Sequence, residues 1–145
     1  MSTMTVVSHH HPLVLRMEAE LLPLFQDALP SLTQASPQVL ASVFAFSTGS
    51  QGAFLEYRFG ISCLLDAVPD HQPDELALLV TVSGLDGEAS VAAEVRWGQP
   101  SGRCEAQATL TEASMPGLHA ALPALLAALR QALERGRPAD EARPA

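Results

Sequence analysis

The stretch VAAEVRWGQPSGRCEAQATL, residues 91–110, holds two runs of alternating apolar and polar side chains on either side of a turn. Pro100 and Gly102 occupy the second and fourth positions of that turn, which is typical of type I. A slip of one residue would move every apolar side chain to the wrong face, so this stretch predicts an antiparallel hairpin. The predicted partners are Trp97 with Cys104, Val95 with Ala106 and Val91 with Leu110 on the buried face, and Arg96 with Glu105 on the other.

Alternation of the same kind precedes this hairpin and predicts further strands, each with one buried face. Phe44 and Phe46 make both faces of the first of these strands partly apolar. The spacing of the turns leads us to expect an antiparallel meander. The predicted strands cover residues 42–48, 55–65 and 76–82, and the turn at residues 84–87 pairs Val80 with Val91 and Leu78 with Ala93.

In the N-terminal part of the chain, the spacing of apolar residues changes from alternation to helical spacing. Residues 13–19 alternate weakly, which predicts a first strand. Residues 21–33 then place apolar side chains at the spacing of one helical face. We expect Pro23 in the first turn of that helix, where a missing N–H has no cost.

Beyond Ser114 the spacing becomes helical again, with one stripe of leucines. Arg130 and Arg135 lie near the end of this helix and Gly136 terminates it. Pro123 predicts either a kink or a helix that starts near Leu122. The stripe consists of Leu118, Leu122, Leu125, Leu126, Leu129 and Leu133.

These elements predict an α+β fold. An antiparallel meander sheet of about five or six strands has an N-terminal helix and a long C-terminal helix packed on one face. We expect a flexible leader over residues 1–12, a single α+β domain over 13–135 and a disordered tail over 136–145. The order of elements resembles that of helix-grip ligand-binding domains in topology alone.

Composition excludes several classes of function. The 145 residues have a formal net charge of −8, with eight arginines and no lysine, so lysine chemistry is excluded and nucleic acid is a poor partner. The longest apolar run, residues 76–82, is too short to cross a membrane, and no secretory signal is evident. Cys63 and Cys104 both fall on apolar-facing positions and are expected to be free thiols, which favours a cytoplasmic protein.

Few residues suggest a catalytic or metal-binding site. The acidic loop 66–75 could hold a divalent cation, but it lacks the spacing of known calcium loops and is more simply a solvated connection. His119 is a lone helical histidine, and the glycines of residues 49–52 join two strands without opening a helix. The His9–His11 run could be native or foreign. We predict no catalytic residue, no metal ligand and no cofactor.

We therefore expect a non-catalytic protein-interaction module, a small acidic adaptor or chaperone-like protein that forms a homodimer or binds a protein partner. The alternatives are a helix-grip-like binder of a small apolar ligand between the sheet and the C-terminal helix and, as a third choice, a metal-dependent enzyme that uses loop 66–75. Residues 56–112 hold ten acids against three arginines, and this asymmetry suits oriented self-association or a basic partner peptide. The predicted interaction surface is Ala120, Ala124, Ala127 and Gln131, and the predicted ligand-binding residues are Phe59, Val80, Ala93, Ala106 and Leu125.

Overall fold

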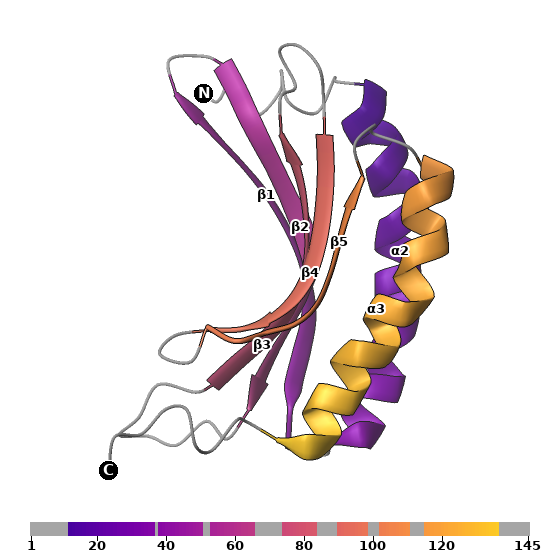
Figure 1. Cartoon of the computed structure of the whole chain (residues 1–145), viewed down its shortest axis with the longest axis vertical. Helices are drawn as coiled ribbons and strands as arrows, with labels where there is room; N and C mark the ends of the chain where they lie inside the picture. The colour runs from indigo at the N-terminus through magenta and orange to yellow at the C-terminus, as the bar shows by residue number, and fades with distance from the viewer. Residues whose placement is uncertain are drawn as a thin grey trace.

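A computed structural model describes residues 12–36, 38–50, 53–65, 74–83, 90–98, 102–110 and 115–136. These residues form two layers, a curved antiparallel sheet and a pair of helices that lie side by side on its convex face (Figure 1). The predicted α+β class and the meander are confirmed. The elements are α2 (Pro12–Ala35), β1 (Leu40–Ser50), β2 (Ala53–Leu65), β3 (Asp74–Ser83), β4 (Ser90–Trp97), β5 (Cys104–Leu110) and α3 (Met115–Arg135).

The sheet has five strands in the order β1-β2-β3-β4-β5, each antiparallel to its neighbour. Alternate residues of each strand face the helices, and those of β2, β3 and β4 are buried there, which gives the strict period of two in β3. α2 packs mainly on β1, and α3 packs mainly on β5. The helices therefore cover opposite halves of one sheet face, and the described part of the other face has no covering layer (Figure 1).

The hydrophobic core lies between the two layers. Each helix contributes one apolar stripe, and the strands contribute their inward side chains. The rings of Phe25, Phe59 and Tyr57 form a row at its centre, with centroids 6.1 and 5.6 Å apart. Side chains that are less than 2% exposed include Met17, Leu21 and Phe25 of α2, Phe59, Ile61, Leu76, Leu78 and Val80 of the sheet, and Leu118 and Leu129 of α3.

The strand predicted over residues 13–19 is wrong, because these residues form the first turns of α2. Val14 and Met17 are buried whereas Leu15 is 44% exposed, so burial follows helical spacing and not the apparent alternation. Pro12, and not Pro23, stands at the helix start, where its missing N–H has no cost. Pro23 is inside the helix on its exposed side.

The pairing of β3 with β4 differs from the predicted register by two residues. Val82 pairs with Val91 and Val80 pairs with Ala93, so the connection spans more residues than the four-residue turn that we predicted. Because the shift is even, every side chain keeps its predicted face.

The hairpin of β4 and β5 is confirmed at Val95 with Ala106 but is wrong nearer the turn. Gly102 adopts a left-handed φ of 62°, and the Trp97 amide donates to the Arg103 carbonyl at 2.9 Å. Cys104 therefore pairs with Arg96 on the uncovered face, and not with Trp97. A β-bulge absorbs the extra residue, Glu105, and restores the register at Ala106.

The C-terminal helix begins at Met115, earlier than the start near Leu122 that Pro123 suggested. Pro123 is exposed inside the helix. Gly136 ends it with a φ of 81° and an amide that donates to the Ala132 carbonyl at 3.0 Å. Among the residues that the structure describes, neither helix is long and apolar enough to span a membrane.

The close approach of β2 and β3 requires a glycine at position 60. A Cβ atom there would lie 1.9 Å from the Leu78 carbonyl oxygen, far inside contact distance. Gly60→Ala should therefore lower the free energy of unfolding by about 1–3 kcal/mol in urea denaturation. Gly98→Ala is the matched control, because its nearest neighbour, in Glu75, would lie 3.6 Å away. Equal stability of the two variants would contradict this steric argument.

Tyr57 makes the stability of the fold sensitive to alkali. Its hydroxyl donates to the Glu18 carboxylate, and burial, followed by the hydrogen bond and charge of Glu18, raises the pKa of the phenol above its usual 10.0. The unfolded chain thus loses this proton before the folded protein does. Above pH 10 the free energy of unfolding should fall by about 1.4 kcal/mol per pH unit from this group.

Tyr57 is the one tyrosine of the chain, so absorbance at 295 nm reports its ionisation alone. We expect no rise in that absorbance until the protein unfolds. Tyr57→Phe should flatten the dependence of stability on pH, although the buried Cys63 thiol leaves a smaller slope of the same sign. A phenol that titrates near pH 10 in the folded protein would refute the prediction.

Candidate functional site

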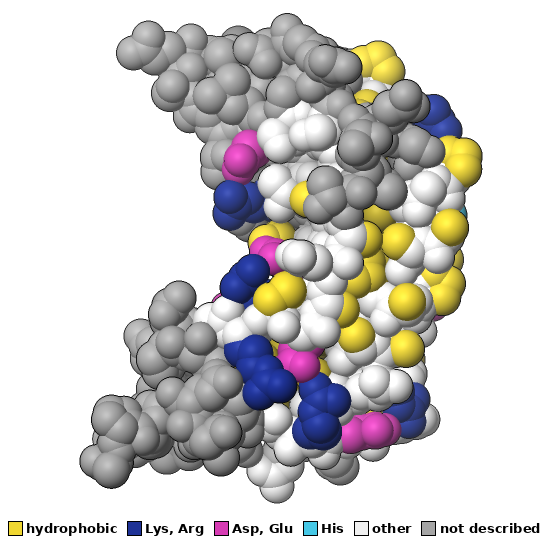
Figure 2. All heavy atoms as spheres, in the orientation of Figure 1, with side chains coloured by type: hydrophobic (Ala, Val, Ile, Leu, Met, Phe, Trp, Pro, Cys, Tyr) yellow, Lys and Arg dark blue, Asp and Glu magenta, His cyan; other side chains and the backbone are white. Residues whose placement is uncertain are grey.

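The uncovered face of the sheet, here called the open face, is concave because the strands bend away from the helices at both ends (Figure 1). Figure 2 shows acidic and basic side chains gathered on this side of the molecule, along the left of the view. The face also has apolar residues, among them Leu40, which is 67% exposed. Mixed polarity on an uncovered, concave surface is typical of a binding face.

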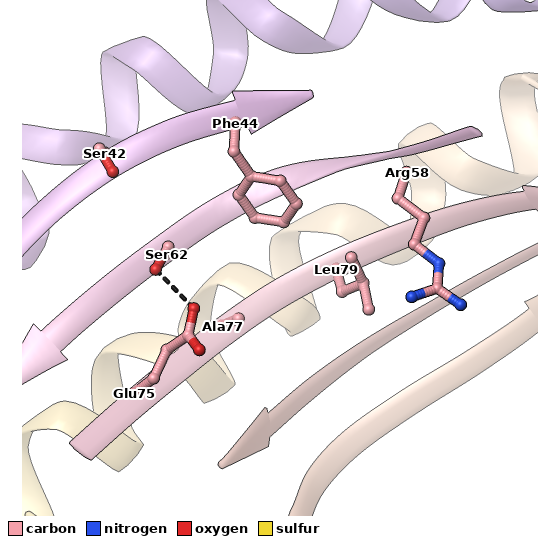
Figure 3. A pocket seen from close by; sticks show the side chains of 7 residues that line it. All are labelled: Ser42, Phe44, Arg58, Ser62, Glu75, Ala77 and Leu79. Atoms are coloured by element: carbon pink, nitrogen blue, oxygen red, sulfur yellow. Dashed lines mark hydrogen bonds between the residues drawn. The ribbon is translucent and has the colours of Figure 1, made fainter. Parts of the chain in front are cut away.

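A depression of about 510 Å³ lies in the open face over the first three strands. It has an apolar middle between two polar ends, as the close-up shows (Figure 3). A volume of this size is in the range of ligand sites, although the strands enclose it from one side only. Its lining consists of Ser42 and Phe44 from β1, Arg58 and Ser62 from β2, and Glu75, Ala77 and Leu79 from β3.

The apolar middle exists because a glycine stands between two large side chains. Phe44, Gly60 and Leu79 are register partners across β1, β2 and β3, and all three face the open side. The missing side chain of Gly60 leaves space into which the ring of Phe44 reaches across β2 (Figure 3). The same glycine thus lets the strands approach closely and leaves room between Phe44 and Leu79, which line the depression.

One polar end is formed by Ser62 and Glu75. The Ser62 hydroxyl donates to Glu75 Oε2 at 2.7 Å (Figure 3). Within the described ranges no arginine or histidine forms an ion pair with this carboxylate, so its charge is available to a cationic group. Ala77, the register partner of Ser62, leaves that end shallow and open.

The other polar end is formed by Arg58. Its Nη2 donates to Glu56 Oε1 at 2.9 Å, while its Nε is buried and lacks a hydrogen-bond partner among the described residues. A buried donor without an acceptor costs about 1–3 kcal/mol. An acceptor that entered the depression would satisfy Nε after a rotation of the guanidinium group.

The charge pairs of the open face run along the strands and not across them, contrary to our expectation. Arg58 pairs with Glu56, and Arg96 pairs with Glu94 at 3.0 Å, each two residues apart on one strand. Residues i and i+2 share a face, which permits this geometry. The bulge also removes Glu105 from Arg96, its predicted partner.

Glu105 lies instead on the helix side of the sheet, at the β5 edge. It accepts hydrogen bonds from Trp97 Nε1 at 2.8 Å and from Arg135 Nη2 at 2.7 Å, and Arg103 Nε is 3.6 Å away. Only 10% of its side chain is exposed. This carboxylate fastens the end of α3 to β4 and β5, so it is structural and does not belong to the depression.

The residues predicted to bind an apolar ligand are part of the core. Phe59, Val80, Ala93 and Leu125 are at most 3% exposed, and Ala106 packs against them while half-buried. They belong to the core between the sheet and the two helices, where Phe59 meets Phe25 of α2. Binding of an apolar molecule among them stays a prediction.

The predicted interaction surface lies on the outer side of α3. Ala120, Ala124, Ala127 and Gln131 are all exposed there, at the spacing of one helical stripe. The structure thus brings the four residues together, and their contact with a partner stays a prediction.

The remaining candidates for chemistry are dispersed. In the acidic loop, residues 66–73 lie outside the described residues, as does the histidine run at 9–11. No cluster of three or more metal-ligating side chains occurs within the described part of the chain. His119 Nε2 lies 2.8 Å from Glu20 Oε1, which links α3 to α2.

Sequence reasoning missed the depression, although one signal pointed to it. Phe44 and Leu79 are large apolar residues on the strand faces that the alternation assigns to solvent. No protein-family model, curated protein or solved structure matches the chain, so its function must be argued from this geometry.

The two cysteines lie on opposite faces of the sheet and should differ in reactivity. Cys63 is fully buried, and burial, with a smaller contribution from the charge of Glu75, raises the pKa of its thiol from 9.0 to about 12. Cys104 is half-buried on the open face. A maleimide at neutral pH should therefore label Cys104 alone, and Cys63 only after unfolding.

Peptide mass spectrometry of the labelled protein would identify the modified thiol. Cys104→Ser should abolish labelling of the folded protein, and Cys63→Ser should leave it unchanged. Rapid labelling of Cys63 in the folded protein would contradict its placement in the core.

Proposed function

We propose that the protein is a non-catalytic interaction module that binds an extended segment of a partner protein along the open face. The observation that supports this most directly is the depression over β1, β2 and β3, with its apolar middle and polar ends. Because the strands enclose it from one side only, a small molecule would stay half exposed there. A small-molecule site normally buries most of its ligand, so an extended chain suits this surface better.

The charges of the protein favour a basic segment. The chain has a net charge of −8, and the Glu75 carboxylate at the rim of the depression has no ion-pair partner among the described residues. A segment with an arginine or lysine over Glu75 and an apolar side chain against Phe44 and Leu79 would match both features. A backbone carbonyl of the segment would provide an acceptor for Arg58 Nε.

The role and location in the cell that we propose follow the same reasoning. A small acidic adaptor or chaperone-like protein holds segments of other proteins without changing them covalently. Two free cysteines on opposite faces of the sheet support a cytoplasmic location, where thiols stay reduced. A homodimer through the exposed α3 stripe stays a prediction from the sequence and competes with dimerisation through any other surface.

Binding of defined peptides tests this function. The probes are fluorescent seven-residue peptides that alternate leucine with arginine, leucine with glutamate, or serine with arginine. We expect the leucine–arginine peptide to bind most tightly in fluorescence anisotropy at physiological salt. Glu75→Gln should weaken that binding by up to about fivefold, as for a partly exposed ion pair. Phe44→Ala should weaken binding of the leucine–arginine peptide and leave the affinity for the serine–arginine peptide unchanged.

Asp27→Asn is the matched control, because it removes one negative charge from an exposed position on α2. Its affinity for the leucine–arginine peptide should equal that of the wild type. Equal weakening by Glu75→Gln and Asp27→Asn would show attraction by net charge alone and would refute binding at the open face.

A further inference from the structure

The two edges of the sheet are built differently. At β5 a bulge interrupts the strand, and Glu105 at the bulge is held by Trp97, Arg103 and Arg135. Bulges and charged residues are common protections of an edge strand against pairing with another chain. These features protect the start of the β5 edge against pairing with further strands.

The β1 edge has none of these protections from Leu40 to Thr48. β1 runs from Leu40 to Ser50 and contains no charged residue and no proline. Its register with β2 is regular from Leu40 to Thr48, and the irregularity lies beyond, at Gly49. No strand covers its outer side among the residues that the structure describes. A long, regular, uncharged edge presents a row of backbone donors and acceptors that can accept another strand.

The flank of α2 that extends beyond β1 is apolar. Contacts fix its orientation, because Glu20 pairs with His119 of α3 and Ser31 accepts a hydrogen bond from Arg130 of α3. One helical turn is 3.6 residues, so the opposite flank of α2 presents residues 15, 22 and 29. All three are leucines, at a spacing of seven residues.

These leucines adjoin the covered side of β1. Leu22 and Leu29 are half-buried, and Leu15 is 44% exposed. On β1 the residues that face the same side are small or apolar, and Ala45 is exposed. We call this surface the edge strip; it consists of Leu15, Leu22, Leu29, Ala41, Val43 and Ala45.

We propose that a second copy of the chain docks on the edge strip, with β1 pairing antiparallel to β1 of the partner and α2 packing beside its counterpart. A dimer with a twofold axis requires a surface that is complementary to itself. An edge strand that pairs antiparallel with its own copy meets this requirement, and so do leucines at a spacing of seven residues. Two copies that each have a net charge of −8 repel one another, so an uncharged contact surface favours self-association here over any acidic face.

This dimer has a continuous ten-stranded sheet, twice the five strands of one chain. The open faces of the two copies then form one longer concave surface. The proposal is independent of the peptide function, because the edge strip lies outside the lining of the depression.

Sedimentation velocity of the full chain over a range of concentrations tests this dimer. Wild type should sediment as a dimer, and Leu15→Glu and Ala45→Glu should each raise the dissociation constant more than about tenfold, since like charges would meet across the axis. Leu24→Glu is the matched control, because Leu24 is 40% exposed on the flank of α2 that faces α3. Ala124→Glu tests the exposed stripe of α3. Both control variants should remain dimeric, and circular dichroism should show all four folded.

Hydrogen exchange provides a second readout that does not depend on a substitution. Amides of β1 should gain protection as the protein concentration rises, and amides of β5 should not. The proposal would be overturned if the wild type were monomeric or if Ala124→Glu or Leu24→Glu dissociated the dimer. Exchange of the β1 amides at a rate independent of protein concentration would also overturn it.

Discussion

Burial of a single sheet face by both helices is the constraint on which the rest of this structure depends. The strands supply one apolar face, and α2 and α3 together cover it. Phe25 and Phe59 meet at the centre of that contact. Because both helices lie on the same side, no described element covers the other face, and this face has a mixture of charged and small residues. The concave shape of that face follows from strands that bend away from the helices at both ends (Figure 1).

Much of the fold could be predicted because its signals are local. Alternation within each strand marks the buried face, and the even shift between β3 and β4 left those faces correct. The first turns of α2 were not predicted because Leu13 and Leu15 alternate with other residues in the pattern of a strand. Burial of Val14 and Met17 depends on contact with the sheet, which is distant in the sequence. The displacement of Cys104 and Glu105 depends on the left-handed Gly102, a turn geometry that composition does not reveal.

The depression could not be predicted by the same means. It depends on which residues become neighbours across three strands, above all Phe44, Gly60 and Leu79, and thus on the register. Local patterns do reveal the unusual placement of Phe44 and Leu79 on solvent-facing positions. They do not reveal that Gly60 lies between them. The polar pair of Ser62 and Glu75 likewise joins residues from two strands.

In the proposed dimer, the bulge at Glu105 would also limit how large the assembly can become. In the terms of polymer chemistry a chain with two reactive ends can grow without limit, whereas a chain with one reactive end can only form pairs. In the proposed dimer, Glu105 and its arginine partners protect the β5 end, so edge-to-edge growth would stop once β1 is occupied. A closed dimer in place of a filament would then follow from Glu105 and the register shift beside it.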